Sequence, residues 1–482
     1  MPVADLLDAL RRADLLLEAV ELPPLAALAA DSRDVVPGAL FVAVRGSRTD
    51  GHAFVPQAVA RGAVAVVVEQ RQAVEVPQVL VRDGRRAAIA LARAWHGDPA
   101  QSLTLIGVTG TNGKTTTTGL VRHLFNADGR AGSIGTLGAF DGAGDEVPST
   151  AGNLTTPGPV DLQATMAALR ARGCTHVAME ASSHSLDQGR LDGVPFAAAI
   201  YTNFTRDHLD YHGTMEAYLA AKLKLSGLLR SGGVEVVHAD EPAWAALAPH
   251  APRVTFGRAS GADLRATGLQ LDATGSRFRL EGRFGVADVR LPLLGDFNVE
   301  NALAAAACAL GLGEGLAPVA ERLQAAPQVP GRMEVVAGHP CAVLRDYAHT
   351  PDALERALRT LRPLATGRLI VVFGCGGDRD RGKRPLMGQL AVTLADLPIV
   401  TSDNPRTEDP EAILDEIEQG MGAAPRRRIT DRRAAIHAAL AEARRGDVVL
   451  LAGKGHETYQ VLGTTKHPFD ERRIVRDALG SP

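Results

Sequence analysis

A glycine- and threonine-rich loop with the sequence G-T-N-G-K-T-T is the clearest candidate for phosphate chemistry in the chain. It follows the apolar run 103–108 and precedes a stretch with apolar residues at helical spacing, so it would join a strand to a helix. Backbone N–H groups of such a loop can cradle phosphate oxygens at the positive end of the helix dipole. Lys114 would neutralise phosphate charge and the Thr115 hydroxyl would bind Mg²⁺; the alternative is a glycine-rich turn with an ordinary exposed lysine. The loop residues are Gly110, Thr111, Asn112, Gly113, Lys114, Thr115 and Thr116.

Four further polar residues are candidates for a metal or catalytic site. Glu180 follows the apolar run 175–179, and a carboxylate at a strand end suits Mg²⁺, although a surface carboxylate is the alternative. His208 and His212 lie four residues apart, a spacing that could suggest zinc on a helix, but the sequence supplies no evident third zinc ligand. Lys222, considered alone, would be an exposed helix lysine.

The elements that must position these residues alternate between strand-like and helix-like runs. The strand-like runs are 40–44, 63–68, 103–108, 175–179, 197–201, 368–373, 397–401 and 447–452. This alternation predicts an α/β fold with largely parallel sheets. A chain of 482 residues is too long for one ordinary core. We expect a small N-terminal α/β domain over 1–98, a central P-loop ATPase-like domain over 99–328, and a C-terminal Rossmann-like domain over 329–482.

Composition narrows the class of protein. The chain is 45% hydrophobic and 22% charged with a formal net charge of -3, which is typical of a soluble globular protein and argues against nucleic-acid binding. Charged residues interrupt the apolar stretches at the N-terminus, so we expect neither a signal peptide nor membrane insertion. The four cysteines are scattered and suggest buried, reduced thiols in a cytoplasmic protein.

The loop at 110–116 resembles that of the Mur ligase family, and other motifs of that family follow in the expected order. They are E-A-S-S-H at 180–184, N-F-T-R-D-H-L-D-Y-H at 203–212, G-D-F-N-V-E-N at 295–301, P-G-R-M-E at 330–334, D-Y-A-H-T-P at 346–351 and G-C-G-G-D-R-D at 374–380. The resemblance implies an ATP-dependent ligase in which Thr115, Glu180 and His208 help to bind Mg²⁺. It makes Lys222, rather than Lys224, the lysine that the family carbamylates to N6-carboxylysine, a further metal ligand.

The same resemblance assigns residues to the nucleotide and leaves His212 a structural role. Asn298 and Asn301 fall three apart in a segment that the family uses at the nucleotide base, although helix capping is the alternative for either one. Asp346 and Arg379 resemble positions that close over ATP, with surface salt bridges as their alternative. The implied catalytic residues are Lys114, Lys222 and His208.

The N-terminal motifs D-S-R at 31–33, P-G-A-L-F-V-A at 37–43 and S-R-T at 47–49 resemble the UDP-binding domain of the MurE and MurF branch. Further positions match those with which MurE-type ligases bind the muramoyl-dipeptide, and Arg190 could pair with a substrate carboxylate. The residues implied for the UDP-sugar-dipeptide are Ser32, Ser47, Arg48, Thr49, Thr155, Thr156, Ser183, Gln188 and Arg190.

The C-terminal third resembles the MurE-type site for the incoming diamino acid. D-N-P-R at 403–406 usually accompanies meso-2,6-diaminopimelate, whose extra carboxylate would suit the planar fork of Arg406, while Glu457 would receive the far ammonium. An alternative is that Arg406 merely ties its loop to Glu408 or Asp409. The residues implied for the diamino acid are Arg384, Asp403, Asn404, Pro405, Arg406, Gly453 and Glu457.

The resemblance thus implies a cytoplasmic, monomeric enzyme of peptidoglycan precursor synthesis. ATP would activate the D-Glu γ-carboxylate of UDP-N-acetylmuramoyl-L-Ala-D-Glu as an acyl phosphate, which the amine of the diamino acid attacks. L-Ornithine and L-lysine remain open as the amino acid added. Two alternative hypotheses come from other functional classes: a nucleotide-binding regulatory ATPase and a cell-wall scaffold.

Overall fold

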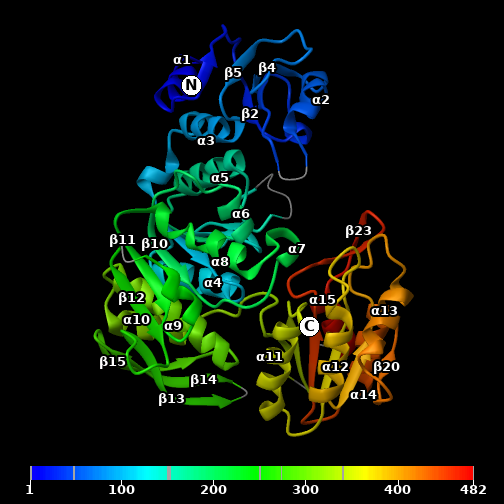
Figure 1. Ribbon diagram of the computed structural model, residues 1–482. Helices are drawn as coiled ribbons and strands as arrows, with labels where there is room; N and C mark the ends of the chain where they lie inside the picture. The colour runs from blue at the N-terminus through cyan, green and yellow to red at the C-terminus, as the bar shows by residue number, and fades with distance from the viewer. Residues whose placement is uncertain are drawn as a thin grey trace. The chain divides into compact units, whose positions relative to one another are not determined.

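The computed structural model describes residues 3–46, 49–148, 154–248, 251–272, 274–338 and 341–480. The chain divides into two compact units. The first comprises Met1–Arg265 with Leu303–Val319, and the second comprises Ala266–Ala302 with Ala320–Pro482. The first unit contains an N-terminal sheet and a larger central sheet, and the second contains a C-terminal sheet (Figure 1).

The N-terminal sheet has the strand order β1-β5-β4-β3-β2 and is parallel except for β1. In β3, Leu40 and Val42 pack with helices α1 and α3, whereas Ala39 and Phe41 pack with α2. Both faces of β3 are therefore buried, which explains why its sequence is continuously apolar. The elements are α1 (Val3–Arg12), β1 (Leu16–Glu18), β2 (Ala27–Ala29), β3 (Ala39–Val42), α2 (Val55–Ala60), β4 (Ala63–Val68), β5 (Gln78–Val81) and α3 (Gly84–Trp95).

The central sheet of the first unit runs β12-β11-β10-β6-β9-β7-β8. Strands β12 to β7 are mutually parallel, and β8 runs antiparallel to β7. Its strands are β6 (Thr104–Thr109), β7 (Ala131–Gly135), β8 (Gly138–Phe140), β9 (His176–Glu180), β10 (Phe196–Tyr201), β11 (Leu229–His238) and β12 (Arg253–Gly257). Its helices include α4 (Lys114–Phe125), α5 (Pro159–Ala171), α6 (Ser183–Asp187), α7 (Leu209–His212) and α8 (Met215–Leu223).

Strand register brings three loops of the central sheet to one edge. Val108 of β6 lies opposite Glu180 of β9, and Thr109 lies opposite Tyr201 of β10. Because these strands are parallel, the loops that follow them emerge side by side at the carboxyl edge, where open α/β sheets bind ligands.

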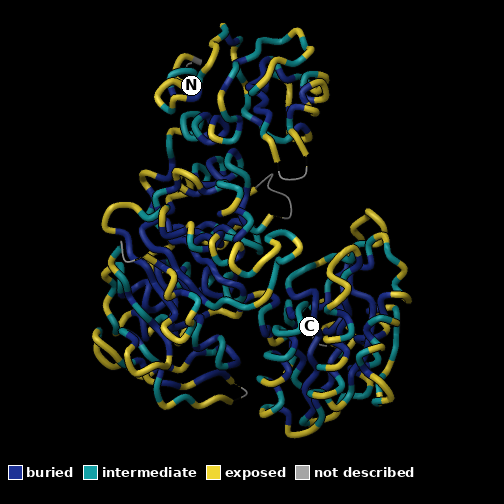
Figure 2. Tube along the Cα trace, in the orientation of Figure 1, coloured by how far each residue is buried: buried dark blue, intermediate teal, exposed yellow. Residues whose placement is uncertain are grey.

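The C-terminal sheet of the second unit runs β16-β17-β21-β18-β19-β20, and only β16 is antiparallel to its neighbour. Helices α11, α12 and α13 share one apolar core with the sheet, and α14 and α15 share the other. Figure 2 shows these strands buried between their helix layers. The elements are β16 (Glu334–Ala337), β17 (Ala342–Asp346), α11 (Pro351–Leu361), β18 (Leu369–Phe373), α12 (Lys383–Leu394), β19 (Leu397–Val400), α13 (Pro410–Gln419), β20 (Arg427–Arg428), α14 (Arg432–Glu442), β21 (Val448–Ala452) and α15 (Glu471–Leu479).

The remaining elements include two antiparallel hairpins, formed by β14 with β15 and by β22 with β23. Their strands are β14 (Gly275–Gly282), β15 (Gly285–Leu291), β22 (Tyr459–Leu462) and β23 (Thr465–Pro468). The other regular elements are β13 (Leu264–Asp272), α9 (Asp296–Gly311) and α10 (Leu316–Gln324).

The predicted α/β fold class is confirmed, and the predicted parallel strands lie within a residue or two of the observed ones. The hairpin of β14 and β15 was not predicted. The domain boundaries near residues 98 and 328 stay predictions. The four cysteines are buried and unpaired, as expected. Across the described ranges, no helix has the length and apolar character needed to cross a membrane.

Candidate active site

The predicted phosphate loop lies between β6 and α4, as the sequence indicated. Gly110 has a φ of +145°, and a Cβ there would lie 1.9 Å from Thr202 Oγ1, so the loop can pass this point only with glycine. Gly113, with a φ of +84°, is the residue that caps the start of α4. The two glycines let the backbone turn tightly from the strand into the helix, whose first turn carries the positive end of the helix dipole.

Lys114 begins α4 and folds back over this loop. Its Nζ donates to the carbonyl oxygens of Gly110 at 3.0 Å and Thr111 at 2.8 Å. Thr115 follows it and is buried. The ammonium is thus held at the mouth of the loop, where it can offset the charge of a phosphate.

Glu180 ends β9 next to β6, and its carboxylate is buried. Oε1 accepts a hydrogen bond from the Thr136 amide at 2.8 Å, and Oε2 accepts one from Thr136 Oγ1 at 3.1 Å. A Cβ at Gly135 would lie 2.4 Å from Oε1, so glycine is required there for the carboxylate to adopt this position. Two hydrogen bonds from one residue therefore fix the orientation of a buried carboxylate beside the phosphate loop.

Lys222 lies on α8 and is almost completely buried, contrary to what its sequence context alone would suggest. Its Nζ donates to the Gly110 carbonyl at 2.6 Å and lies 4.4 Å from the centre of the Tyr218 ring. Burial, aided by the charge of Lys114, lowers the pKa of Lys222 well below its ordinary value. The structure therefore brings a readily deprotonated amine to the phosphate loop.

Three histidine rings gather beside this site. His208 has a φ of +54°, and its ring packs edge-on against His184 at 4.9 Å between centroids. His212 packs against the same ring and shares a hydrogen bond with Ser183 Oγ at 3.0 Å. Burial lowers the pKa of His208 and lowers that of His184 to about 4, which favours the neutral imidazole. Neutral imidazole is the form that binds metal ions.

The residues expected to bind the dipeptide cluster around the end of β9. Arg190 Nη1 donates to the Thr156 carbonyl at 3.0 Å, and its Nε donates to Gln188 Oε1 at 2.9 Å. Thr156 Oγ1 donates to the Glu180 carbonyl at 2.7 Å, and Thr155 Oγ1 is 3.2 Å from Thr136 Oγ1. These contacts place part of the predicted dipeptide set next to the predicted metal carboxylate.

The N-terminal sheet carries the residues expected to bind UDP. Ser32 is buried, and its hydroxyl donates to Gln57 Oε1 at 3.2 Å. Thr49 lies just before the isolated bridge residue Asp50. Ser47 and Arg48 lie outside the described residues.

The predicted nucleotide residues of the second unit are Asn298, Asn301, Asp346 and Arg379. Asn301 Nδ2 donates to Asn298 Oδ1 at 3.1 Å within α9, so the two amides share one face, and both side chains are buried. Asp346 ends β17 and accepts a hydrogen bond from the Met333 amide at 2.6 Å. Removal from water raises the pKa of Asp346 to about 6. Arg379 is exposed, and its Nη1 donates to the Asp378 carbonyl at 3.0 Å.

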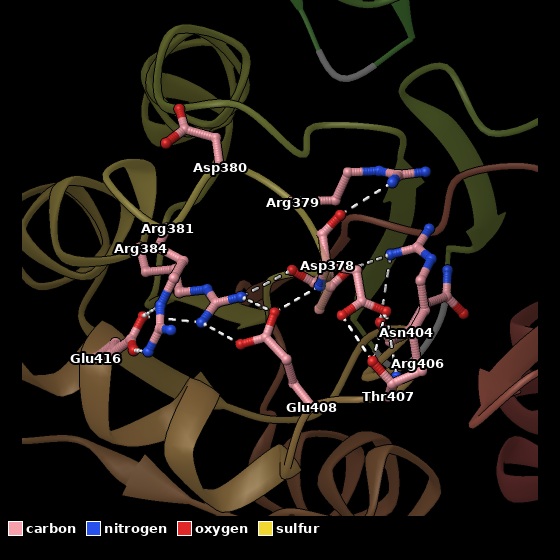
Figure 3. Close-up of polar contacts among 12 residues, drawn as sticks. Asp378, Arg379, Asp380, Arg381, Arg384, Asn404, Arg406, Thr407, Glu408 and Glu416 are labelled. Carbon is pink, nitrogen blue, oxygen red and sulfur yellow. Dashed lines mark hydrogen bonds and ion pairs between the residues drawn. The ribbon is translucent and has the colours of Figure 1, made fainter. Parts of the chain in front are cut away.

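Arg384 is enclosed by acidic side chains of the second unit (Figure 3). Its guanidinium binds both oxygens of Glu408 at 2.9 and 3.0 Å and one oxygen of Glu416 at 2.8 Å. The Arg384 side chain is 0% exposed. In this arrangement it offers no surface to the diamino acid that it was expected to contact.

Arg406 joins two loops at the carboxyl edge of the C-terminal sheet. It has a φ of +53°, and its Nη1 donates to the Gly377 carbonyl at 2.7 Å (Figure 3). Within the described residues, the Arg406 side chain donates hydrogen bonds to backbone carbonyls and not to the carboxylates of Glu408 or Asp409. It therefore does not tie its loop to these two carboxylates, as the alternative interpretation predicted.

The loops after β19 and β21 meet beside it. Asn404 Nδ2 donates to Glu457 Oε2 at 2.9 Å, and Gly453, with a φ of +115°, brings its backbone close to the Asp403 carboxylate. Pro405 continues the same loop, and its carbonyl closely approaches Gly377. Segments separated by about fifty residues in sequence thus form one polar surface.

Three family models match most of the chain. The model described as Mur ligase family, catalytic domain matches residues 25–96, the Mur ligase middle domain matches 108–309, and the Mur ligase glutamate ligase domain matches 331–455. The chain belongs to the Mur ligase family.

Relatives of this Mur ligase are similar over nearly their full length. The UDP-N-acetylmuramoyl-L-alanyl-D-glutamate–2,6-diaminopimelate ligase of Geobacillus kaustophilus (strain HTA426) is 46% identical over 469 residues, with 95% of each chain covered. The protein of the same name from Gloeobacter violaceus (strain ATCC 29082 / PCC 7421) is 47% identical over 464 residues, with 94% of each covered. A solved structure of a ligase of this name is 37% identical with a TM-score of 0.66, covering 96% of this chain and 97% of that one.

In this Mur ligase the structure brings the phosphate loop, Glu180 and Lys222 to one edge of the central sheet. The nucleotide and diamino-acid positions from Asp346 onward belong to the second unit. Sequence reasoning gave no role to Thr136, which orients Glu180, or to His184, although His184 lies within a quoted motif. It also missed Lys454, whose position between two glycines after an apolar strand was a usable signal.

Proposed function

We propose that this protein joins meso-2,6-diaminopimelate to the D-Glu γ-carboxylate of UDP-N-acetylmuramoyl-L-Ala-D-Glu, using ATP, in peptidoglycan precursor synthesis. The observation that carries the proposal is the near full-length identity of 46–47% to relatives named for this reaction. The phosphate loop, the buried carboxylate beside it and the D-N-P-R loop supply chemistry that the reaction needs. The enzyme would act in the cytoplasm as a monomer.

ATP would place its phosphates on the loop 110–116, with the helix amides and Lys114 offsetting their charge. Asn298 and Asn301 would face the nucleotide base. Asp346 and Arg379 would contribute from the second unit when ATP is bound.

Mg²⁺ fits the donors beside this loop. Thr115 and Glu180 offer a hydroxyl and a buried carboxylate, which are the hard oxygen ligands that Mg²⁺ prefers. Within the described part of the chain, no group of three or more His, Cys, Asp or Glu side chains could hold a metal ion. A Mg²⁺ ion bound by Thr115 and Glu180 would therefore need further oxygen ligands from ATP and from a modified Lys222. His208 would help to bind a second ion. Bound Mg²⁺ would offset negative charge between the two anionic reactants.

Lys222 would supply an oxygen ligand as a carbamate. Its neutral amine would attack carbon dioxide, forming the N–C bond while one C=O electron pair moves to oxygen and the amine proton leaves to solvent. The lowered pKa of Lys222 and the enclosed position of its Nζ both support this assignment. The modification would give this side chain a negative charge.

The dipeptide substrate would lie across Thr155, Thr156, Ser183, Gln188 and Arg190, with its UDP end at Ser32 and the segment 47–49. The Arg190 guanidinium could bind a substrate carboxylate once it leaves Gln188 Oε1. The γ-carboxylate would then lie close to the phosphate loop.

The diamino acid would bind at the carboxyl edge of the C-terminal sheet. Arg406 would receive its far carboxylate, and Glu457 its far ammonium, with Asp403, Asn404, Pro405 and Gly453 shaping the site. Since Arg384 is enclosed by Glu408 and Glu416, we propose that it holds the D-N-P-R loop in place and does not touch the substrate.

The reaction would proceed through an acyl phosphate. A γ-carboxylate oxygen attacks the γ-phosphorus of ATP, and the bond to the ADP oxygen breaks. The diamino-acid amine then attacks the acyl carbon and loses a proton, and phosphate leaves with the carboxylate oxygen. Lys114 would stabilise the charge that develops on the transferred phosphoryl group.

Phosphate release measured with ATP, Mg²⁺, UDP-N-acetylmuramoyl-L-Ala-D-Glu and each amino acid in turn tests this function. We expect release that depends on meso-2,6-diaminopimelate and is much slower with L-lysine or L-ornithine. A preference for L-lysine or L-ornithine would overturn the substrate assignment. Phosphate release at the same rate with and without any amino acid would instead indicate a regulatory ATPase.

A further inference from the structure

Lys454 carries an ammonium group that is completely buried in the second unit. Its Nζ donates to Asn404 Oδ1 at 2.9 Å and to the Tyr459 carbonyl at 2.9 Å, and lies 3.4 Å from Asp403 Oδ1. Two of the three N–H donors of the ammonium are thus used in hydrogen bonds, and the Asp403 carboxylate pairs with its charge. A buried charge is tolerated only with such partners, so the loops after β19 and β21 are built around this cation.

Lys454 fixes which way the Asn404 amide faces. Asn404 Oδ1 accepts from Lys454 Nζ and from the Val461 amide, both at 2.9 Å. Two donors on one atom require that atom to be the oxygen, so Nδ2 must point the other way. It donates there to Glu457 Oε2 at 2.9 Å.

Glu457 is thereby anchored through one oxygen only. Lys454 Nζ also approaches Oε2, at 3.7 Å, whereas Oε1 has no hydrogen bond to any part of the chain that the structure describes. The geometry leaves Oε1 as the acceptor that a ligand can use. Asp403 Oδ1 is likewise buried without a hydrogen bond, although it lies close to Lys454.

We propose that Lys454 is a positioning residue that acts through Asn404 to orient Glu457 toward the far ammonium of the diamino acid, and so sets selectivity for two amines over one. This inference rests on the proposed function. Lys454 itself does not touch the substrate. It holds the Asn404 amide and the Glu457 carboxylate, which do.

Charge around Glu457 supports the same role. The charged or titratable groups that face it are Asp403, Lys454, Arg406, Tyr347 and Tyr459. Burial raises the pKa of Glu457 and Asp403 raises it further, while the hydrogen bond from Asn404 and the charges of Lys454 and Arg406 oppose the change. Since an ammonium binds the ionised carboxylate, loss of Lys454 would let Glu457 take up a proton at a higher pH.

The test compares Lys454→Met with Lys466→Met, which removes an exposed lysine from β23 of the same unit. Phosphate release by each full-length variant gives KM for meso-2,6-diaminopimelate, for ATP and for the UDP-dipeptide. We expect Lys454→Met to raise KM for the diamino acid roughly 10- to 100-fold, as for a lost hydrogen bond to a charged group. KM for the other two substrates should stay within about twofold, and Lys466→Met should match the wild type.

Two further readouts separate positioning from general damage. The variant should lose most of the wild-type preference for diaminopimelate over 2-aminopimelate, which keeps both carboxylates but lacks the second amine. The acid limb of its kcat/KM profile for the diamino acid should also move to higher pH. Equal changes in all three KM values, or an unchanged preference, would overturn the inference.

A second variant covers the case in which Lys454→Met does not fold. Asn404→Asp keeps an oxygen acceptor for Lys454 but removes the donor to Glu457 Oε2, so the same selective rise in KM is expected. An unchanged KM for the diamino acid in a folded Asn404→Asp variant would refute the proposal that Lys454 acts on Glu457 through Asn404. A wild-type enzyme that shows no diamino-acid-dependent phosphate release would refute the proposed function itself, together with this inference.

Discussion

Replacement of Lys222 by alanine should abolish most activity while leaving the protein folded. The side chain is buried against the phosphate loop, with Nζ 2.6 Å from the Gly110 carbonyl. If this amine becomes a carbamate, alanine removes an anionic oxygen ligand and leaves a cavity in its place.

The expected loss follows from what the side chain contributes. Removal of one group that stabilises transition-state charge typically costs about 10²- to 10³-fold in kcat, or roughly 3–4 kcal/mol. Deletion of a buried stem of this size also costs about 2–4 kcal/mol of folding stability. That is a drop of several degrees in Tm, so the variant should remain folded at about 25 °C, where kcat is measured.

Chemical rescue identifies the charge that is missing. The cavity left by the Lys222→Ala substitution should admit a short carboxylate, so acetate or propionate should restore part of the activity of this variant. Lys224→Ala is the matched control, because Lys224 is 49% exposed and pairs with Asp187 at 2.8 Å on the surface. This control should keep nearly full activity and show no response to carboxylates.

The opposite pattern of rescue would refute the reasoning. Restoration by methylammonium or propylamine, with no effect of carboxylates, would mean that Lys222 acts as an ammonium. Mass analysis of the wild type in carbon-dioxide-containing buffer gives a second test. If Lys222 lacks the mass increase of a carbamate, the same conclusion follows.

Three other changes have defined outcomes. Glu180→Gln keeps an oxygen acceptor for the Thr136 amide but removes the charge, so activity should require several-fold more Mg²⁺; an unchanged Mg²⁺ titration would exclude a ligand role. Arg406→Lys should raise KM for meso-2,6-diaminopimelate by about tenfold or more but hardly change that for L-lysine, which lacks the far carboxylate, and an equal effect on both would contradict this assignment. Arg384 holds the pKa of Glu408 at about 2, below its ordinary 4.5, so this pair stabilises the fold above pH 4.5 and the stabilisation is lost as pH falls toward 2. Urea unfolding of Arg384→Met should therefore show reduced stability near neutral pH and a weaker acid dependence than the wild type; an identical acid dependence would contradict the assignment.

Much of the fold was predictable because the parallel strands are buried on both faces. Runs such as 63–68 and 448–452 are continuously apolar, and each leads into a polar loop, which is sufficient to predict a parallel sheet. The hairpin of β14 and β15 has charged residues along its exposed face, with Arg277 opposite Arg290, so its strands lacked the apolar signal.

The site was less predictable because its contacts join distant segments. The sequence predicted an exposed Lys222, and only the family resemblance reversed this, whereas the structure buries it beside Gly110 through packing of α8. Arg384 matched a binding position in sequence, but Glu408 and Glu416, more than twenty residues away, surround it. Lys454 and Asn404 meet across fifty residues, and no local pattern encodes that contact.

Transfer of oxygen-18 from the substrate to phosphate tests the central claim most directly. UDP-N-acetylmuramoyl-L-Ala-D-Glu labelled in its γ-carboxylate would be incubated with ATP, Mg²⁺ and meso-2,6-diaminopimelate, and the released phosphate analysed by mass spectrometry. We predict that each phosphate carries one labelled oxygen and that the amide product forms in equal amount. Unlabelled phosphate, released without amide formation, would show that water attacks ATP and would contradict an acyl-phosphate ligase.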